Sequence, residues 1–265
     1  MKVNIFFIGP PRIMTTKIIS LLSEHPQFCV STPKESKFFS LYYSQGKKLL
    51  EGHYPDYNNE PFVVYSNPID CNMDYVADRI YNYNPDAKII MGLRDPILRA
   101  ISHYGIHRYN LPMGRVCENI WDEFDRNYKN FNPRKFLSEG DFIPYCNEYG
   151  SCYVQQYFEC SLYFNIYKKW FEKFPNNMHI YSHDDFKFNF LFQFNKILDF
   201  VGAYSIPSVD SSPIHSISQY RGSLDYKRLK KEFIERYPTI YNYYVKDLKL
   251  MGEVIGSPLN QIWEY

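Results

Sequence analysis

The sequence has few glycines and no cysteine pair with the spacing of a metal or redox motif. Only 12 of its 265 residues are glycine, and its six cysteines are scattered without a CxxC. Free thiols, a reducing compartment and no bound metal are therefore expected. No apolar run is long enough to cross a membrane, and the apolar start is typical of a strand, not of a signal peptide. We expect a cytoplasmic protein without a membrane span.

The chain also lacks a charge excess of either sign. A formal net charge of +1 excludes a broad basic field for nucleic acid or anionic membranes, so any anion site must be local. Aromatic rings are abundant instead, with 26 Tyr and 21 Phe. Tyrosine suits cleft walls that bind sugars or ring systems, although an AT-rich genome would produce the same enrichment.

Short apolar segments alternate with helical patterns along the chain. We predict helices in the region after residue 15 and roughly over the last 40 residues, and in between at 72–83, 97–109, 155–174 and 184–202. Strands are predicted at residues 4–8, 28–30, 62–65, 87–93 and 178–181. This alternation predicts a single α/β domain over residues 1–265, with a P-loop-like three-layer fold and a central, mostly parallel sheet flanked by helices.

Residues 6–16 combine a strand end, a turn and a helix start. The turn at 9–11 is followed by Arg12 and by the hydroxyl pair Thr15 and Thr16. Unpaired first-turn amides, the helix dipole and an added cation together favour a phosphate. The GxxxxGK[ST] pattern of a Walker A loop is missing. A strand-turn-helix without a ligand is also common in α/β domains, so this loop alone leaves both interpretations open.

A second candidate anion site follows the apolar segment 87–93. Arg94 comes at the carboxyl end of this predicted strand, where open α/β sheets bind their ligands, and guanidinium matches a phosphate. Ser102 lies about 9 Å further along the helix that begins at Pro96, at 1.5 Å per residue. The alternatives are a salt bridge from Arg94 to a neighbouring acid such as Asp95, and a serine tolerated on a helix face.

Taken together, these elements resemble the sulfotransferases that use 3′-phosphoadenosine 5′-phosphosulfate (PAPS). The chain looks most similar to their heparan-sulfate and glycosaminoglycan, or saccharide, branch. RDPxxRAxSHY is the specific element. The supporting stretches, in order, are IGPPRIMTTKIISLLSEHP, KESKFF, YSQG, NPDAKIIMGLRDPILRAISHY and SLYFNIYKKWFEKFPNNMHIYSHDDF.

The resemblance implies roles for particular residues. Arg12 would hold the 5′-phosphate of PAPS and stabilise the bridging oxygen as the sulfuryl group leaves. The amides of Ile13, Met14, Thr15 and Thr16 would cradle that phosphate. The 3′-phosphate, which distinguishes PAPS from ATP, would be bound by two residues of the second site, Arg94 and Ser102.

Further roles follow from the same resemblance. Glu35, in KESKFF, would be the general base that takes the acceptor's proton, although without the resemblance a solvated acid between two lysines is the better interpretation. Tyr163 would lie near the nucleotide. Arg221 and Gly222 fall where the family's late basic loop folds over the 3′-phosphate.

The chain departs from the family pattern at three points. Ile13 and Met14 stand where the loop usually has glycine, which predicts an adapted cradle geometry. The segment 66–68 lacks the lysine that the saccharide branch carries at the end of its third strand. The late disulfide pair of that branch is also absent, in agreement with a reducing compartment.

The resulting hypothesis is an enzyme that moves a sulfuryl group from PAPS to a hydroxyl or amine of a saccharide or small molecule, releasing 3′,5′-adenosine diphosphate (PAP). In-line displacement requires positioning and charge neutralisation and no metal. The acceptor is expected to bind in the region 105–159. The alternatives are a non-catalytic protein that binds PAP, and a nucleotide kinase, against which the missing Walker lysine argues.

Overall fold

The computed structural model describes residues 1–111, 115–134, 138, 156–209 and 225–265. Its residues group into two compact units. Within the described ranges, the first unit holds 1–93, 138 and 168–209, and the second holds 94–111, 115–134, 156–167 and 225–265. The expectation of one domain with an acceptor-binding insertion at 105–159 stays a prediction, because much of that insertion lies outside the described residues.

The first unit is built on a five-stranded parallel sheet with the order β2-β3-β1-β4-β5. All four neighbouring pairs are parallel, which confirms the predicted α/β sheet. The strands are β1 (Ile5–Phe7), β2 (Phe28–Val30), β3 (Phe62–Ser66), β4 (Lys88–Leu93) and β5 (Met178–Ser182). Because β1 lies between β3 and β4, the turn that follows it leaves the sheet near its middle.

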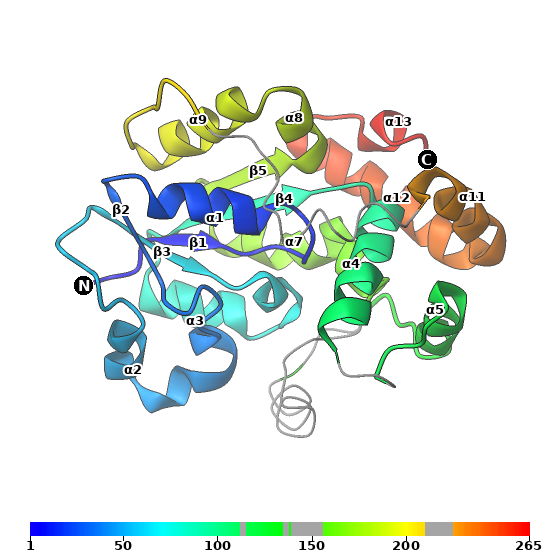
Figure 1. Cartoon of the computed structure of the whole chain (residues 1–265), viewed down its shortest axis with the longest axis horizontal. Coiled ribbons are helices and arrows are strands. Elements are labelled where there is room, and N and C mark those ends of the chain that lie inside the picture. The colour runs from blue at the N-terminus through cyan, green and yellow to red at the C-terminus, as the bar shows by residue number, and fades with distance from the viewer. Residues whose placement is uncertain (112–114, 135–137, 139–155, 210–224) are drawn as a thin grey trace. The chain divides into compact units, whose positions relative to one another are not determined.

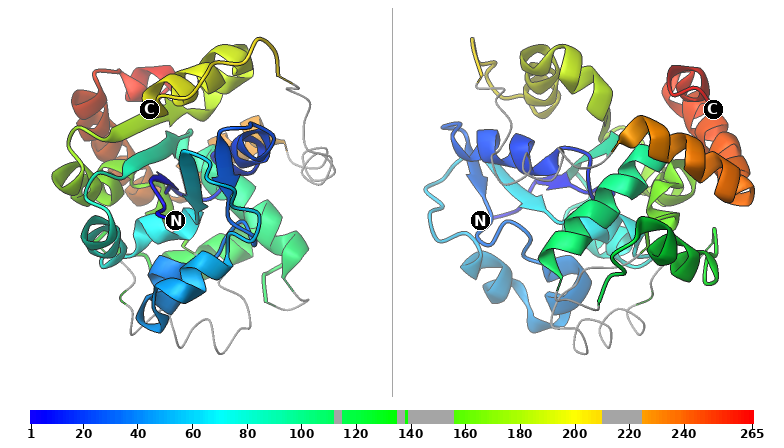
Figure 2. Two further views of the ribbon diagram at one scale, coloured as in Figure 1. Left: turned by 90° about the vertical axis from the view of Figure 1, so that its left-hand side faces the viewer. Right: turned by 45° about the vertical axis from the view of Figure 1, so that its right-hand side comes forward.

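Helices cover both faces of this sheet (Figure 1). Those of the first unit are α1 (Thr15–Ser23), α2 (Lys47–Gly52), α3 (Val76–Tyr83), α8 (His183–Phe188) and α9 (Phe190–Val201). A π-helical turn at Phe38–Tyr42 and 3₁₀ turns at Tyr43–Gln45 and Pro68–Asn72 complete the unit. The turned views in Figure 2 also show the sheet between helices.

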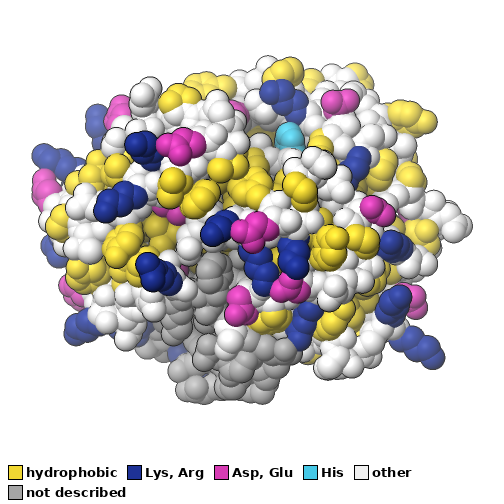
Figure 3. Space-filling view, turned by 180° about the vertical axis from the view of Figure 1, so that it is seen from behind, with side chains coloured by type: hydrophobic (Ala, Val, Ile, Leu, Met, Phe, Trp, Pro, Cys, Tyr) yellow, Lys and Arg dark blue, Asp and Glu magenta, His cyan; other side chains and the backbone are white. Residues whose placement is uncertain are grey.

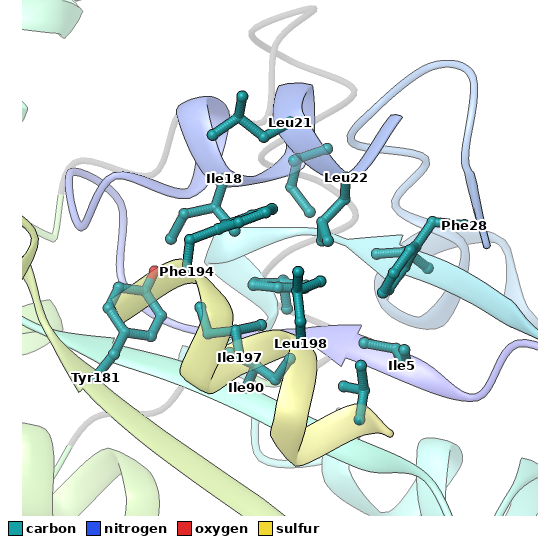
Figure 4. Packing of buried hydrophobic residues seen from close by; sticks show 14 of the residues in the cluster. Ile5, Ile18, Leu21, Leu22, Phe28, Ile90, Tyr181, Phe194, Ile197 and Leu198 are labelled. Atoms are coloured by element: carbon teal, nitrogen blue, oxygen red, sulfur yellow. The ribbon is translucent and has the colours of Figure 1, made fainter. Parts of the chain in front are cut away.

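The core on one face joins α1, α8 and α9 to the sheet. In Figure 4 the apolar side chains of α1, among them Ile18 and Leu22, point toward Phe194 and Leu198 of α9. These residues are fully buried and recur at the three- and four-residue spacing that gives a helix one apolar face. The packing fixes α1, and with it the loop that precedes α1.

The opposite face is mostly aromatic. Phe6 of β1 lies edge-on to Phe39, with ring centroids 5.4 Å apart, and Phe39 lies edge-on to Tyr65 of β3 at 5.1 Å. Edge-to-face packing of this kind suits the ring quadrupoles. Phe39 also contacts Tyr83 of α3 at 5.4 Å, so the segment after Glu35 is held firmly against the sheet.

The second unit is helical. It contains α4 (Pro96–Asn110), α5 (Ile120–Tyr128), α11 (Tyr226–Arg236), α12 (Pro238–Ile255) and α13 (Leu259–Ile262), with a 3₁₀ turn at Glu159–Ser161. Phe124 of α5 packs edge-on against both Phe158 and Phe233, at centroid distances of 5.2 and 5.9 Å. The predicted helices after residue 97 and near the end of the chain are therefore confirmed.

One predicted helix begins later than expected. The apolar spacing predicted a helix from 155 to 174, but α7 spans Tyr163–Lys173, and the described residues before it form turns. The carboxylate of Asp247 accepts hydrogen bonds from the amides of Phe164 and Asn165, at 3.0 and 3.1 Å. A cap supplied from α12 thus sets the start of α7, and the local sequence carries no sign of it.

Candidate functional site

The predicted phosphate loop ends in a backbone conformation that normally selects glycine. Met14, which directly precedes α1, has φ 77° and ψ 7°, and Arg12 has φ 80°. Both lie in the left-handed region, which costs a residue with a Cβ about 1–2 kcal/mol. The missing glycine at Met14 therefore has not removed the glycine-like turn. That turn aims the chain into the first turn of α1, where Thr15 is buried and Thr16 exposed.

Ile13 attaches the loop to the hydrophobic core. Its side chain is 1% exposed and belongs to the core beneath α1, and its carbonyl oxygen accepts a 3.0 Å hydrogen bond from the hydroxyl of Tyr181. Burial raises the pKa of Tyr181, so this hydroxyl keeps its proton and remains a donor. Gly92 of β4 makes room for both, because a Cβ there would meet Tyr181 Cζ at 2.6 Å and Ile13 Cδ1 at 2.8 Å.

A lysine joins the loop to the predicted general base. Lys34 Nζ donates a 2.9 Å hydrogen bond to Thr16 Oγ1 and lies 3.3 Å from Glu35 Oε1. The Lys34 and Glu35 side chains are 28% and 46% exposed, so both reach solvent. The sequence identified Thr16 and Glu35 separately and treated Lys34 only as a flanking charge. The structure brings all three together.

A buried polar cluster lies at the carboxyl end of β3, where the saccharide branch would carry its lysine. Asp70 accepts hydrogen bonds from Tyr65 and from the Asn67 amide, at 2.7 and 2.5 Å. Burial raises the pKa of Asp70 to about 7, and the charge of Glu35 adds to the rise. Within the described part of the chain, Ser36 Oγ, Ser66 Oγ and Asn67 Oδ1 are buried without hydrogen-bond partners.

The second predicted anion site begins where β4 ends. β1 and β4 are neighbours in register, with Phe7 opposite Ile90, so the turn after β1 and the chain after Leu93 leave the same edge of the sheet. Arg94 is mostly buried, and its carbonyl oxygen accepts a 2.5 Å hydrogen bond from the hydroxyl of Tyr163. Tyr163 is itself fully buried, so the structure places it beside a predicted phosphate ligand.

Asp95 is engaged in capping α4. Its carboxylate accepts a 2.9 Å hydrogen bond from the Leu98 amide and pairs with Lys230 Nζ at 2.7 Å. Pro96 at the first helical position and Asp95 as N-cap give α4 a strong start. Asp95 thus forms an ion pair with Lys230 of α11.

Arg99 organises the inner side of α4. It is fully buried, and it donates to Ser161 Oγ at 2.6 Å and to the Tyr157 carbonyl at 2.5 Å. Ser102 and His103 are also buried on α4, and the His103 ring lies edge-on to Tyr157 at 5.2 Å. The His103 ring thus packs against Tyr157, and its Nδ1 lies 3.3 Å from Arg99 Nη1. The sequence motif contained Arg99 but gave no sign that it is structural.

Two predicted site residues, Arg221 and Gly222, lie outside the described residues, as does much of the predicted acceptor region 105–159. Among the residues described, no group of three or more His, Cys, Asp or Glu side chains could hold a metal ion. Four of the cysteines are free thiols, as predicted: Cys29, Cys71, Cys117 and Cys160. Within the same ranges, no helix has the length and apolarity to cross a membrane. On the face in Figure 3, basic and acidic side chains are interspersed.

Comparison with solved structures places the fold. A sulfotransferase from Alicyclobacillus acidocaldarius superposes over 100% of both chains with a TM-score of 0.69, at 18% sequence identity. The fold is that of a sulfotransferase. A mouse sulfotransferase, SULT7A1, solved in complex with PAP, aligns more weakly, with a TM-score of 0.45, 16% identity, and coverage of 83% of this chain and 64% of that one.

Sequence comparison points the same way. The chain is 31% identical over 104 residues to the membrane-associated sulfotransferase kil1 of Dictyostelium discoideum, a match that covers 38% of this chain. This chain therefore spans only 22% of the length of that curated relative. No family model matches the sequence. The predicted resemblance to sulfotransferases is confirmed, and the assignment to a heparan-sulfate or glycosaminoglycan branch is not.

Proposed function

We propose that the chain transfers a sulfuryl group from PAPS to a hydroxyl or amine of a saccharide or small-molecule acceptor. One observation carries this proposal: a single ammonium group, Lys34 Nζ, contacts both the Thr16 hydroxyl of the loop and the Glu35 carboxylate. In-line transfer needs a site for the leaving phosphate and a base for the acceptor on either side of the moving group. The first unit holds candidates for both within reach of one side chain.

The loop residues fit a phosphate group. The left-handed turn at Met14 directs the chain into the amino-terminal end of α1, where first-turn amides and the helix dipole favour an anion. We propose that Arg12, with the amides of residues 13–16 and the two threonine hydroxyls, binds the 5′-phosphate. Arg12 would also neutralise charge on the leaving oxygen. PAPS supplies the activated sulfuryl group.

The remaining assignments are part of the same proposal. Arg94 and Ser102 bind the 3′-phosphate, and Tyr163 supports Arg94 through its hydrogen bond to the Arg94 carbonyl. Arg221 and Gly222 complete the 3′ site. Glu35 takes the proton of the acceptor hydroxyl or amine. No step of this reaction needs a metal.

The first experiment is calorimetric titration with PAP. The wild-type protein should bind PAP, and Arg94→Ala should weaken binding by about tenfold or more through loss of charge-assisted hydrogen bonds. Arg228→Ala, which removes an exposed arginine of α11, should leave the affinity unchanged. Absence of PAP binding by the wild-type protein would reject both the sulfotransferase and the non-catalytic PAP-binding alternative, and preferential binding of ATP would favour a kinase.

The second experiment measures turnover of labelled PAPS with sugars, phenols and amines as acceptors. Glu35→Gln should lower kcat by about 10²–10⁴-fold, the usual contribution of a general base. A fully active Glu35→Gln variant would remove the base assignment. PAP binding without turnover on any acceptor would favour the non-catalytic alternative.

The cytoplasmic location also belongs to this proposal. It rests on scattered free thiols and on the absence of a long apolar run in the sequence. The Dictyostelium relative is named as membrane-associated, so fractionation of cells that express the tagged chain is the direct test.

A further inference from the structure

Lys34 contacts both the predicted phosphate cradle and the predicted general base. It follows β2, four residues beyond Val30, and its side chain extends to the first turn of α1. There its ammonium group lies 2.9 Å from Thr16 Oγ1 and 3.3 Å from Glu35 Oε1. One oxygen belongs to the predicted phosphate cradle and the other to the predicted base.

Stability does not account for this arrangement. Lys34 and Glu35 are both partly exposed, and exposed ion pairs contribute little to folding because water and salt screen them. A lysine that connects two predicted reaction groups is therefore better explained by what it does to a ligand. Lys48 of α2 is an exposed lysine of the same unit and serves as the comparison.

Lys34 also faces open space. A cavity of about 500 Å³ beside α1 and β2 is lined by Thr16 and Lys34, and also by the carboxylates of Asp56 and Glu60. Cavities of this size hold small ligands. The Lys34 side chain is itself 28% exposed, so a ligand can reach its ammonium group without a rearrangement of the chain.

We propose that Lys34 contacts the sulfuryl oxygens of the donor and stabilises their negative charge during transfer. This inference rests on the proposed function. In the transfer, the bond between sulfur and the bridging oxygen of PAPS breaks, and its electron pair stays on the phosphate of PAP. A bond forms between sulfur and the acceptor's oxygen or nitrogen, and Glu35 takes the proton that the acceptor loses. Lys34 remains protonated throughout.

The proposed role of Lys34 would also compensate for the lysine that the saccharide branch carries after its third strand and that this chain lacks. Ser66 and Asn67 supply buried, uncharged groups at that place. Lys34 supplies a cation from the segment after a different strand, β2, next to the predicted base in the sequence. Oriented cations at a developing negative charge are among the largest contributions to such reactions.

The test compares two ligands that differ only in the sulfuryl group. PAP and PAPS are titrated without acceptor into the wild-type protein and into Lys34→Met, Lys34→Arg and Lys48→Met. Lys34→Met should weaken PAPS by about ten- to a hundredfold, the effect of one charged hydrogen bond, while PAP affinity changes less than about threefold. Lys34→Arg should restore most of the PAPS affinity, and Lys48→Met should match wild type for both ligands.

Turnover gives the second readout. With any acceptor found active, Lys34→Met should lower kcat by about 10²–10³-fold and change the KM of the acceptor little. Equal weakening of PAP and PAPS by Lys34→Met, or no weakening of either, would overturn the role of Lys34 and leave the proposed function standing. A wild-type protein that binds neither ligand would overturn both.

Discussion

The hydroxyl of Tyr181 on β5 donates a hydrogen bond to the carbonyl oxygen of Ile13 in the loop before α1, at 3.0 Å. This bond holds a predicted ligand-binding loop from inside the core, because both residues are almost fully buried. A strand that follows the loop by more than 160 residues therefore fixes the loop's position. Packing in the core therefore holds the loop in its conformation before a ligand binds.

Tyr181→Phe should destabilise the protein by about 1–3 kcal/mol. The substitution keeps the ring but leaves the Ile13 carbonyl buried without its donor. Urea unfolding followed by circular dichroism measures the change. Tyr204→Phe is the matched control, because Tyr204 is exposed and its variant should unfold at the wild-type urea concentration. Equal stability of Tyr181→Phe and wild type would show that the carbonyl finds another donor.

Gly92→Ala should cost about 1–3 kcal/mol by overpacking. The new methyl would lie 2.6 Å from Tyr181 Cζ and 2.8 Å from Ile13 Cδ1, closer than real Cβ contacts allow. Gly52→Ala, at a helix position with open space around the added Cβ, should be neutral or slightly stabilising. Thermal unfolding of the two variants compares them directly, and similar melting temperatures would contradict the tight packing at β4.

Met14 should be one of the few non-glycine positions at which glycine is preferred to alanine. Met14→Ala and Met14→Gly both lose the methionine side chain, so the difference between them reports the backbone. With φ at 77°, the glycine variant should be more stable by about 1 kcal/mol, the reverse of the usual order. The free energies of unfolding in urea provide the measurement. An alanine variant that is equally or more stable would show that the backbone does not keep the left-handed turn.

Asp70→Asn should reduce the amount by which the free energy of unfolding falls as the pH rises. Burial raises the pKa of Asp70 from 3.8 to about 7 in the folded protein, so between these values only the folded state keeps the proton. Stability therefore falls with rising pH across this window, by at most about 1.4 kcal/mol per pH unit, and levels off above the folded-state pKa. An asparagine side chain cannot ionise, so the variant lacks this contribution.

The comparison for Asp70→Asn is made against wild type at each pH, because burial also raises the pKa of Asp247 to about 7. The unfolding free energies of the variant and the wild type are compared across the window between the two pKa values of Asp70. They should be similar near the unfolded-state pKa, and the variant should be the more stable protein near the folded-state pKa. Parallel curves would mean that Asp70 stays ionised in the folded protein.

The sheet could be predicted from the sequence because its signals are local. The segment before Arg94 is apolar over almost its whole length, as a strand buried on both faces must be, and proline with aspartate marks the start of α4. The start of α7 could not be predicted, since its cap, Asp247, comes from another helix. The same limit applies to Tyr181, whose tie to the loop depends on strand order.

The candidate site could likewise be predicted from the sequence only in part. Residue types identified Arg12 and Thr16, because a phosphate loop needs cationic and hydroxyl groups, whereas Glu35 was identified only through the family resemblance. Lys34 was passed over as a neighbouring charge, and its link to Thr16 arises only when the segment after β2 packs beside α1. The turn at Met14 also needed the structure, because a methionine in the sequence gives no indication of a left-handed backbone.

The central place of β1 has a consequence for how the chain folds. Its first residue, Ile5, pairs with Val64 on one side and with Lys88 on the other. Parallel pairing over such separations is slow, because the entropy of closing long loops is spent before the contacts form. On a ribosome, β1 emerges well before either partner strand and must wait for both. The segment on which the loop depends is thus synthesised early and paired late.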